Sequence, residues 1–81
     1  MAKLTKLQRS NKAHERLFND YNKKINVLIL DKKKYSKEKH LEYAVKRFYH
    51  KSVLDYQLDH KKVASLDDRK RYFDYAVRNV K

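Results

Sequence analysis

Residues 4–30 read LTKLQRSNKAHERLFNDYNKKINVLIL, and the spacing of their side chains decides the fold. Positions that share one side of a helix recur at alternating intervals of three and four residues. The spacing therefore predicts one long helix over roughly residues 4–30. A short strand is the alternative for residues 25–30, but a lone strand would have nothing to pair with, so we favour helix. The positions that form this seam are Leu4, Leu7, Asn11, His14, Phe18, Tyr21, Ile25 and Leu28.

The remainder of the chain also favours helices, because it contains neither glycine nor proline. Tight turns, hairpins and phosphate-binding loops usually need the positive φ of glycine or the fixed φ of proline. Serines mark the expected helix starts near Ser36, Ser52 and Ser65. Apolar positions before and after Ser52 fall on different sides of one helix, so we expect a bend or break near Lys51 and Ser52. A last helix should begin at Leu66 and end near Val80. It should bury Leu66, Phe73, Ala76, Val77 and Val80.

These elements predict a single all-α domain over residues 1–81, a compact arrangement of three or four helices with a long N-terminal helix. A chain of 81 residues buries only about 60% of the surface that its unfolded form exposes, and 41% of its residues are apolar. It has no cysteine, which excludes disulfides and thiolate metal sites. Its apolar stretches are far shorter than the ~20 residues that a membrane span needs. We therefore expect a cytoplasmic protein that does not enter the membrane.

The charge of the chain is strongly positive and unevenly distributed. Its formal net charge is +12. The charges sum to +5 over residues 1–30, +5 over residues 31–51 and +2 over residues 52–81, counted from the sequence. A basic surface of this kind is typical of proteins that bind a polyanion. We therefore assign the basic surface to the first fifty residues and the scaffold to the rest.

A stripe of basic residues follows the first predicted helix on the side opposite its seam. The stripe is about 20 Å long at a rise of about 1.5 Å per residue. Such a stripe can follow a phosphate backbone, and each contact would release condensed counterions. A solvated helix face is the alternative, but the low number of acids nearby favours polyanion binding. The residues of the stripe are Arg9, Lys12, Arg16 and Lys23.

A lysine cluster follows in the connection to the next helix. Lys32, Lys33 and Lys34 lie where cations meet the negative end of the first helix dipole, which alone could explain them. Lys37 and Lys39 fall in the first turn of the next helix, where positive charge is unfavourable for stability. Lysines and free backbone N–H groups at a helix start can instead hold an anion. We expect a phosphate contact there.

Further candidates for nucleic-acid contact lie close to this cluster. Tyr35, Arg47 and Lys51 are the ones we include in the predicted interface. Tyrosine can stack on bases, although a ring packed at the edge of the core is the more common role. The predicted nucleic-acid-binding residues are thus Arg9, Lys12, Arg16, Lys23, Lys33, Lys34, Tyr35, Lys37, Lys39, Arg47 and Lys51.

No residue pattern predicts catalysis, a metal site or a cofactor, so we expect a binding protein and not an enzyme. The histidines His14, His40, His50 and His60 form no ligand pair at helical spacing and have no thiolates near them. Most serines are explained as helix caps, which leaves no nucleophile beside a base. The pattern is similar in kind to small helical regulators of phages and plasmids, but no motif in it is specific to one family.

Two functions of different classes fit the sequence. The first is a nucleic-acid-binding accessory or regulatory protein, with DNA favoured over RNA and phosphates bound by lysine and arginine. The second is a helical inhibitor or adaptor, of the type that mobile elements encode, that binds an acidic protein surface or a protein–RNA assembly. The seam of the first helix also fits a homodimer. Attachment to an anionic membrane is weaker, because Asn11, His14 and Asn22 interrupt any broad apolar face.

Overall fold

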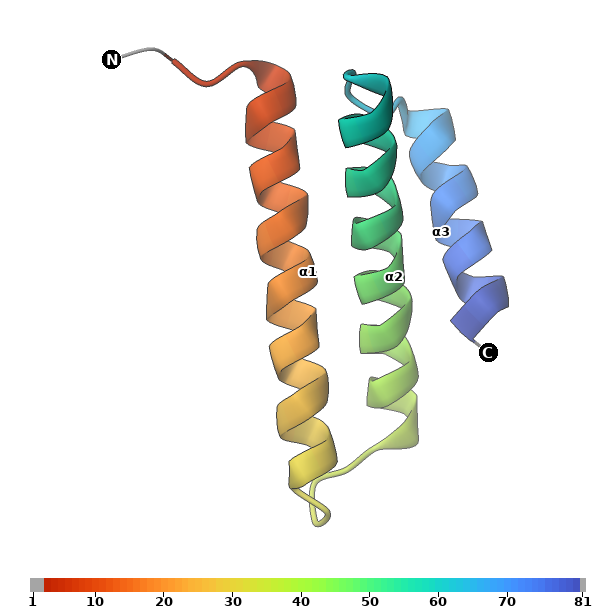
Figure 1. Ribbon diagram of the computed structural model, residues 1–81. Coiled ribbons are helices and arrows are strands. Elements are labelled where there is room, and N and C mark those ends of the chain that lie inside the picture. Colours follow the sequence, from red (N-terminus) through yellow and green to blue (C-terminus); the bar gives the residue numbers. More distant parts are fainter. Residues whose placement is uncertain (1–2, 81) are drawn as a thin grey trace.

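The computed structural model describes residues 3–80, which form three helices joined by two short connections (Figure 1). Helix α1 spans Lys6–Leu30, α2 spans Lys37–His60 and α3 spans Leu66–Val80. Residues 3–80 contain no strand. The all-α fold, the long first helix and both ends of the last helix are therefore confirmed. Residues 25–30 are helical, so the alternative of a strand there is wrong.

Side-chain caps start all three helices. Thr5 and Gln8 form a capping box. The backbone N–H of Gln8 donates to Thr5 Oγ1 at 3.1 Å, and the backbone N–H of Thr5 donates to Gln8 Oε1 at 2.9 Å. Ser36 Oγ accepts from the Lys39 amide at 3.3 Å, and Ser65 Oγ accepts from the Asp68 amide at 3.1 Å. These bonds satisfy N–H groups that have no partner within the helix. The predicted starts at Ser36 and Ser65 are confirmed.

The predicted break near Lys51 and Ser52 is wrong, because α2 runs without interruption through both residues. Its apolar side chains change sides for another reason. Helix α2 lies between α1 and α3 and packs against both of them (Figure 1). One side of α2 therefore has to be apolar for α1 and another for α3. A helix with two buried sides gives the pattern that we interpreted as a break.

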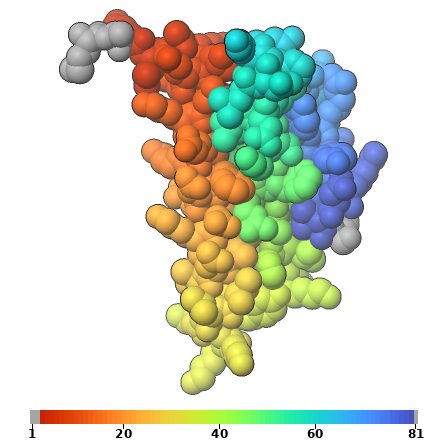
Figure 2. Space-filling model, in the orientation of Figure 1, coloured from red at the N-terminus to blue at the C-terminus, as the bar shows by residue number. Residues whose placement is uncertain are grey.

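The helices form a layer and do not close around a common core. Within residues 3–80, the backbones of α1 and α3 make no contact within 8 Å, and the molecule measures 46 × 32 × 16 Å. Its radius of gyration is 14.3 Å, against roughly 12 Å for a compact domain of this length. The expectation of a compact domain is therefore corrected. Because α3 is shorter than α2, it covers only the part of the hairpin far from the α1–α2 connection (Figure 2).

The core is small and lies where α2 packs against α1 and against α3. Ala76 anchors α3, but Leu66 and Phe73, which we expected to be buried, are 60% and 45% exposed. They are exposed because α3 has only one neighbour, and only the side that faces α2 is covered. The buried apolar residues are Ile25, Leu28, Val53, Leu54, Ala64 and Ala76.

A fully buried glutamine joins the three segments of the fold. Gln57 has 0% exposure. Its Nε2 donates to Asn11 Oδ1 on α1 at 2.9 Å, and its Oε1 accepts from Ser10 Oγ at 3.2 Å. The same Oε1 accepts from the backbone N–H of Ala64, in the α2–α3 connection, at 3.1 Å. The polar residues of the α1 seam therefore contact α2 of the same chain, and Asn11 is not left for a partner.

We predict that Gln57→Leu destabilises the protein. Leucine fills a similar volume but leaves the Ala64 N–H and the Asn11 side chain without partners, which should lower the free energy of unfolding by about 2 to 3 kcal/mol. Urea unfolding followed by circular dichroism measures the change. Leu58→Gln, at an exposed position of the same helix, is the control and should change stability by less than about 0.5 kcal/mol. Equal effects of both substitutions would contradict the role of the Gln57 network.

A histidine pair lies beside this network in the α1–α2 interface. His14 Nδ1 and His50 Nδ1 are 2.9 Å apart, and the His50 ring stacks on Tyr21 with centroids 5.9 Å apart. One nitrogen must donate and the other accept, so at least one ring is neutral. Burial, with added repulsion from His14 and Lys46, lowers the pKa of His50 to about 4. Burial and the charge of Arg69 lower the pKa of His14.

We predict that acidification weakens the fold between pH 6.5 and about 4, the window set by the ordinary and the folded pKa of His50. In this window the unfolded chain binds more protons than the folded protein, so the free energy of unfolding falls as the pH falls. The partial exposure of both rings reduces the effect to the order of 1 kcal/mol. Urea unfolding at pH values near both ends of the window measures it.

The variant His50→Gln should flatten this pH dependence, whereas His60→Gln, at an exposed position, should keep it. The pKa of Asp68 is lowered from 3.8, first by its hydrogen bond with Ser65, so this carboxyl adds to the loss of stability only in the lower part of the window, below about pH 5. If the free energy of unfolding stays constant or rises as the pH falls from 6.5 to about 4, the two histidine rings are not both neutral in the folded protein, and the prediction is contradicted.

Candidate nucleic-acid interface

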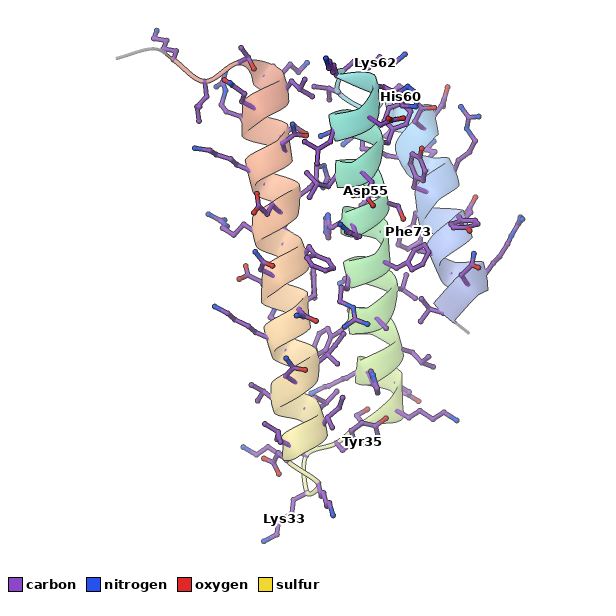
Figure 3. All side chains as sticks on the ribbon, in the orientation of Figure 1. Lys33, Tyr35, Asp55, His60, Lys62 and Phe73 are labelled. Carbon is purple, nitrogen blue, oxygen red and sulfur yellow. The ribbon has the colours of Figure 1, made fainter. Side chains whose placement is uncertain are left out.

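The stripe of Arg9, Lys12, Arg16 and Lys23 lies on α1 along its solvent side, and all four side chains are exposed. Figure 3 shows basic side chains that project from α1 away from α2. The arrangement follows from the seam, because residues at heptad spacing opposite the buried side must face water. The predicted geometry of the stripe is thus present, and nothing in α2 or α3 covers it.

The α1–α2 connection turns tightly around Asp31. The Asp31 carboxylate accepts from the Lys33 amide at 3.2 Å, and the Asp31 backbone oxygen accepts from the Lys34 amide at 3.1 Å. These bonds stabilise a turn without glycine and direct the lysines outward, as Figure 3 shows for Lys33 at the tip. At the start of α2, Ser36 already accepts from the Lys39 amide. The cap therefore occupies one of the N–H groups that we expected an anion to bind.

A pocket of about 360 Å³ opens where the end of α1, the connection and the start of α2 meet. It brings together Lys23 of the α1 stripe, Lys34 of the connection and Lys39 of α2, which belong to three successive segments. Its wall is apolar, and Asp31 is the acidic residue that lines it. We call this the lysine pocket; its lining residues are Lys23, Lys24, Val27, Leu28, Asp31, Lys34, Lys39 and Tyr43.

The lysines of the pocket form no ion pair with the described residues. Within residues 3–80, the ion pairs involve other residues, and none of Lys23, Lys24, Lys34 and Lys39 lies within 4.0 Å of a carboxylate oxygen. Lys24 Nζ lies 5.0 Å from the ring centroid of Tyr21 and 5.8 Å from that of Tyr43. Aromatic faces attract the ammonium group and hold it at the pocket wall. Four lysines and one carboxylate, that of Asp31, thus line one opening, and the carboxylate accepts a hydrogen bond from the Lys33 backbone N–H.

Three predicted interface residues have intramolecular partners. Arg47 is half-buried between α1 and α2, and its Nη1 donates to Asn22 Oδ1 at 3.0 Å. Lys51 pairs with Asp55 at 3.2 Å. The Tyr35 hydroxyl lies 2.8 Å from His40 Nδ1. The exposed residues Lys33 and Lys37 flank the pocket in sequence without lining it.

The predicted interface left out Lys24 and Tyr43, which line the pocket. The stripe was traced by heptad spacing, and Lys24 lies about 100° around the helix from Lys23. Tyr43 lies in the first turns of α2, and only the pairing of the two helices places it beside the end of α1. The sequence carried one usable signal for Lys24, its position directly after a residue of the stripe.

A second surface is apolar and follows the exposed side of the α2–α3 contact. Phe73 points from α3 toward α2 (Figure 3) and separates two hollows. One hollow, of about 370 Å³, includes Tyr49, Leu66 and Arg69; the other, of about 260 Å³, includes Leu41 and Val77. We call these two hollows the α3 groove. No element within residues 3–80 covers it.

Comparison with known proteins gave no relative. No family model, no curated protein and no solved structure matches the chain. Within the described residues, no helix is long and apolar enough to cross a membrane, and no group of three or more histidine and acidic side chains is arranged to hold a metal ion. The interpretation of the surface therefore depends on its own geometry and charge.

We predict that Arg47 contributes to stability more than to binding. Arg47→Gln removes the bond to Asn22 and should lower the free energy of unfolding by about 1 kcal/mol. Its effect on the salt dependence of DNA binding should be small, because the side chain is half-buried and its Nη1 bonds to Asn22. A double-mutant cycle with Asn22→Ala should give a coupling energy of at least about 0.5 kcal/mol. A salt slope reduced by about 0.9 with unchanged stability would instead make Arg47 a phosphate contact.

Proposed function

We propose that this protein binds nucleic acid through the lysine pocket and the α1 stripe. One observation carries the proposal: lysines from α1, from the connection and from α2 surround one opening without carboxylate partners among the described residues. Like charges that line one pocket repel one another, so the arrangement costs stability unless an anion binds there. A phosphate backbone supplies repeated negative charges at the scale of this surface.

The α1 stripe extends the same surface. Lys23 belongs to both the stripe and the pocket, so the two form one continuous basic surface along the solvent side of α1. Contacts of this type position a nucleic acid without reading its sequence. The protein then acts as an accessory or regulatory factor, with affinity that depends steeply on salt.

We predict that Lys23→Gln/Lys34→Gln/Lys39→Gln weakens nucleic-acid binding more than it changes stability. If each lysine contacts a phosphate, the slope of log affinity against log salt for duplex DNA should fall in magnitude by roughly 2 to 3, since each contact contributes about 0.9. Fluorescence anisotropy with duplex DNA, single-stranded DNA and RNA at several salt concentrations measures the slope. Urea unfolding should show an unchanged or slightly higher stability.

The matched control is Lys61→Gln/Lys62→Gln/Lys70→Gln, which removes the same charge from exposed positions. Lys62 lies at the opposite end of the molecule from Lys33 (Figure 3). If both triple variants lose binding equally, net charge alone governs affinity and the localised surface is wrong. Weak binding of the unaltered protein to all three nucleic acids would overturn the proposed function.

The α3 groove supports the second candidate function, a helical adaptor or inhibitor for an acidic protein surface. Phe73 and Leu66 expose apolar area that the fold leaves uncovered, and Arg69, Lys70 and Asp74 line the hollow beside it. Apolar anchors with charged residues around them suit an amphipathic partner helix. If the folded protein binds none of the three nucleic acids, the adaptor function is favoured.

A further inference from the structure

The lysine pocket has an apolar wall that a phosphate group does not need. Val27, Leu28 and Tyr43 line it together with the lysines. Phosphate is bound by N–H groups and positive charge, and it gains nothing from hydrocarbon or an aromatic ring. The volume of about 360 Å³ also exceeds what one phosphate group fills. The pocket therefore suits a ligand that has both an apolar body and negative charges.

The lysines that line the pocket come from three segments of the chain. Lys23 and Lys24 belong to α1, Lys34 to the connection and Lys39 to α2. Lysine stems can cover apolar surface while the ammonium groups stay in water. A bound ligand would then have its apolar part inside the pocket and negative charge on more than one side of it.

A nucleotide within a single strand has this chemistry. Its base is a planar, largely apolar body, and phosphates lie on both sides of it along the chain. Bases of a duplex are paired and stacked, and one would have to be extruded to enter a pocket. Proteins that bind single strands combine a positive groove with aromatic side chains on which bases stack.

We propose that the lysine pocket holds one unpaired base of a single-stranded nucleic acid, while its lysines bind the flanking phosphates. Tyr43 supplies the aromatic wall, next to Tyr21 with ring centroids 5.9 Å apart. This inference rests on the proposed function and narrows its target from nucleic acid in general to single strands.

The test compares three probes of equal length, about 12 nucleotides, which lies within the ~4–16 nucleotide site sizes of single-strand binders. They are an oligothymidylate, an abasic strand with the same phosphates, and a duplex. The oligothymidylate should bind about tenfold or more tightly than the abasic strand at about 0.15 M salt, given that one stacked base contributes about 1–3 kcal/mol. The duplex should bind less tightly than the oligothymidylate, because its bases are paired and stacked and cannot enter the pocket without being extruded.

Two single substitutions test whether the base binds in the lysine pocket. Val27→Glu places a carboxylate in the pocket at a position that is 67% exposed, so the fold should tolerate it. Ile29→Glu makes the same charge change at a residue that is 50% exposed and outside the pocket lining. Val27→Glu should lower affinity for oligothymidylate about tenfold and Ile29→Glu no more than about threefold, since only the first places a carboxylate at the pocket wall and among its lysines.

The outcomes separate the two proposals. If oligothymidylate and the abasic strand bind equally, the base contributes nothing and the single-strand inference is overturned, while phosphate binding stands. If no probe binds, the proposed function itself fails. If Val27→Glu and Ile29→Glu act equally, the base is bound elsewhere and the pocket assignment is overturned. Oleate serves as a fourth probe, for an anionic lipid. If the protein binds oleate tightly and binds oligothymidylate and the abasic strand equally, the pocket is assigned to an anionic lipid and the inference is overturned as well.

Discussion

The buried amide of Gln57 is the constraint on which the arrangement of the chain depends. It bonds to Ser10 and Asn11 on α1 and to the Ala64 backbone in the connection to α3. An amide with no exposed surface must have partners, because an unsatisfied buried polar group costs free energy. The bonds therefore fix the register of α1 against α2 and the exit of the chain toward α3. A purely apolar contact in a core this small would permit more alternatives.

The central position of α2 explains both the flat shape and the exposed surfaces. With neighbours on two sides, α2 uses its apolar residues for contacts with α1 and α3, and the outer helices each have one neighbour. The side of α1 away from α2 is left to basic residues, and α3 keeps Phe73 and Leu66 partly exposed. Because α3 is short, the loop end of the α1–α2 hairpin stands alone. The lysine pocket lies at that end.

Paired and unpaired charges lie on different parts of the molecule. The described ion pairs lie on α2 and α3, whereas the lysines around the pocket have no such partner among residues 3–80. Self-repulsion at a net charge of +12 opposes a compact state. The charges are placed on the solvent side of α1 and at the loop end, where water and salt screen them. This placement leaves them available to a polyanion.

The sequence by itself determined the all-α fold, the first and last helices and the α1 stripe. These features follow from local rules, namely helical spacing, serine caps and the absence of glycine and proline. It did not determine the continuity of α2, because a helix between two neighbours and a broken helix give the same apolar pattern. Likewise, the burial of Gln57, the histidine pair and the lysine pocket each need residues from two or three segments. Only tertiary packing decided those features, since the register between helices places Lys23, Lys34 and Lys39 around one opening and turns Arg47 toward Asn22.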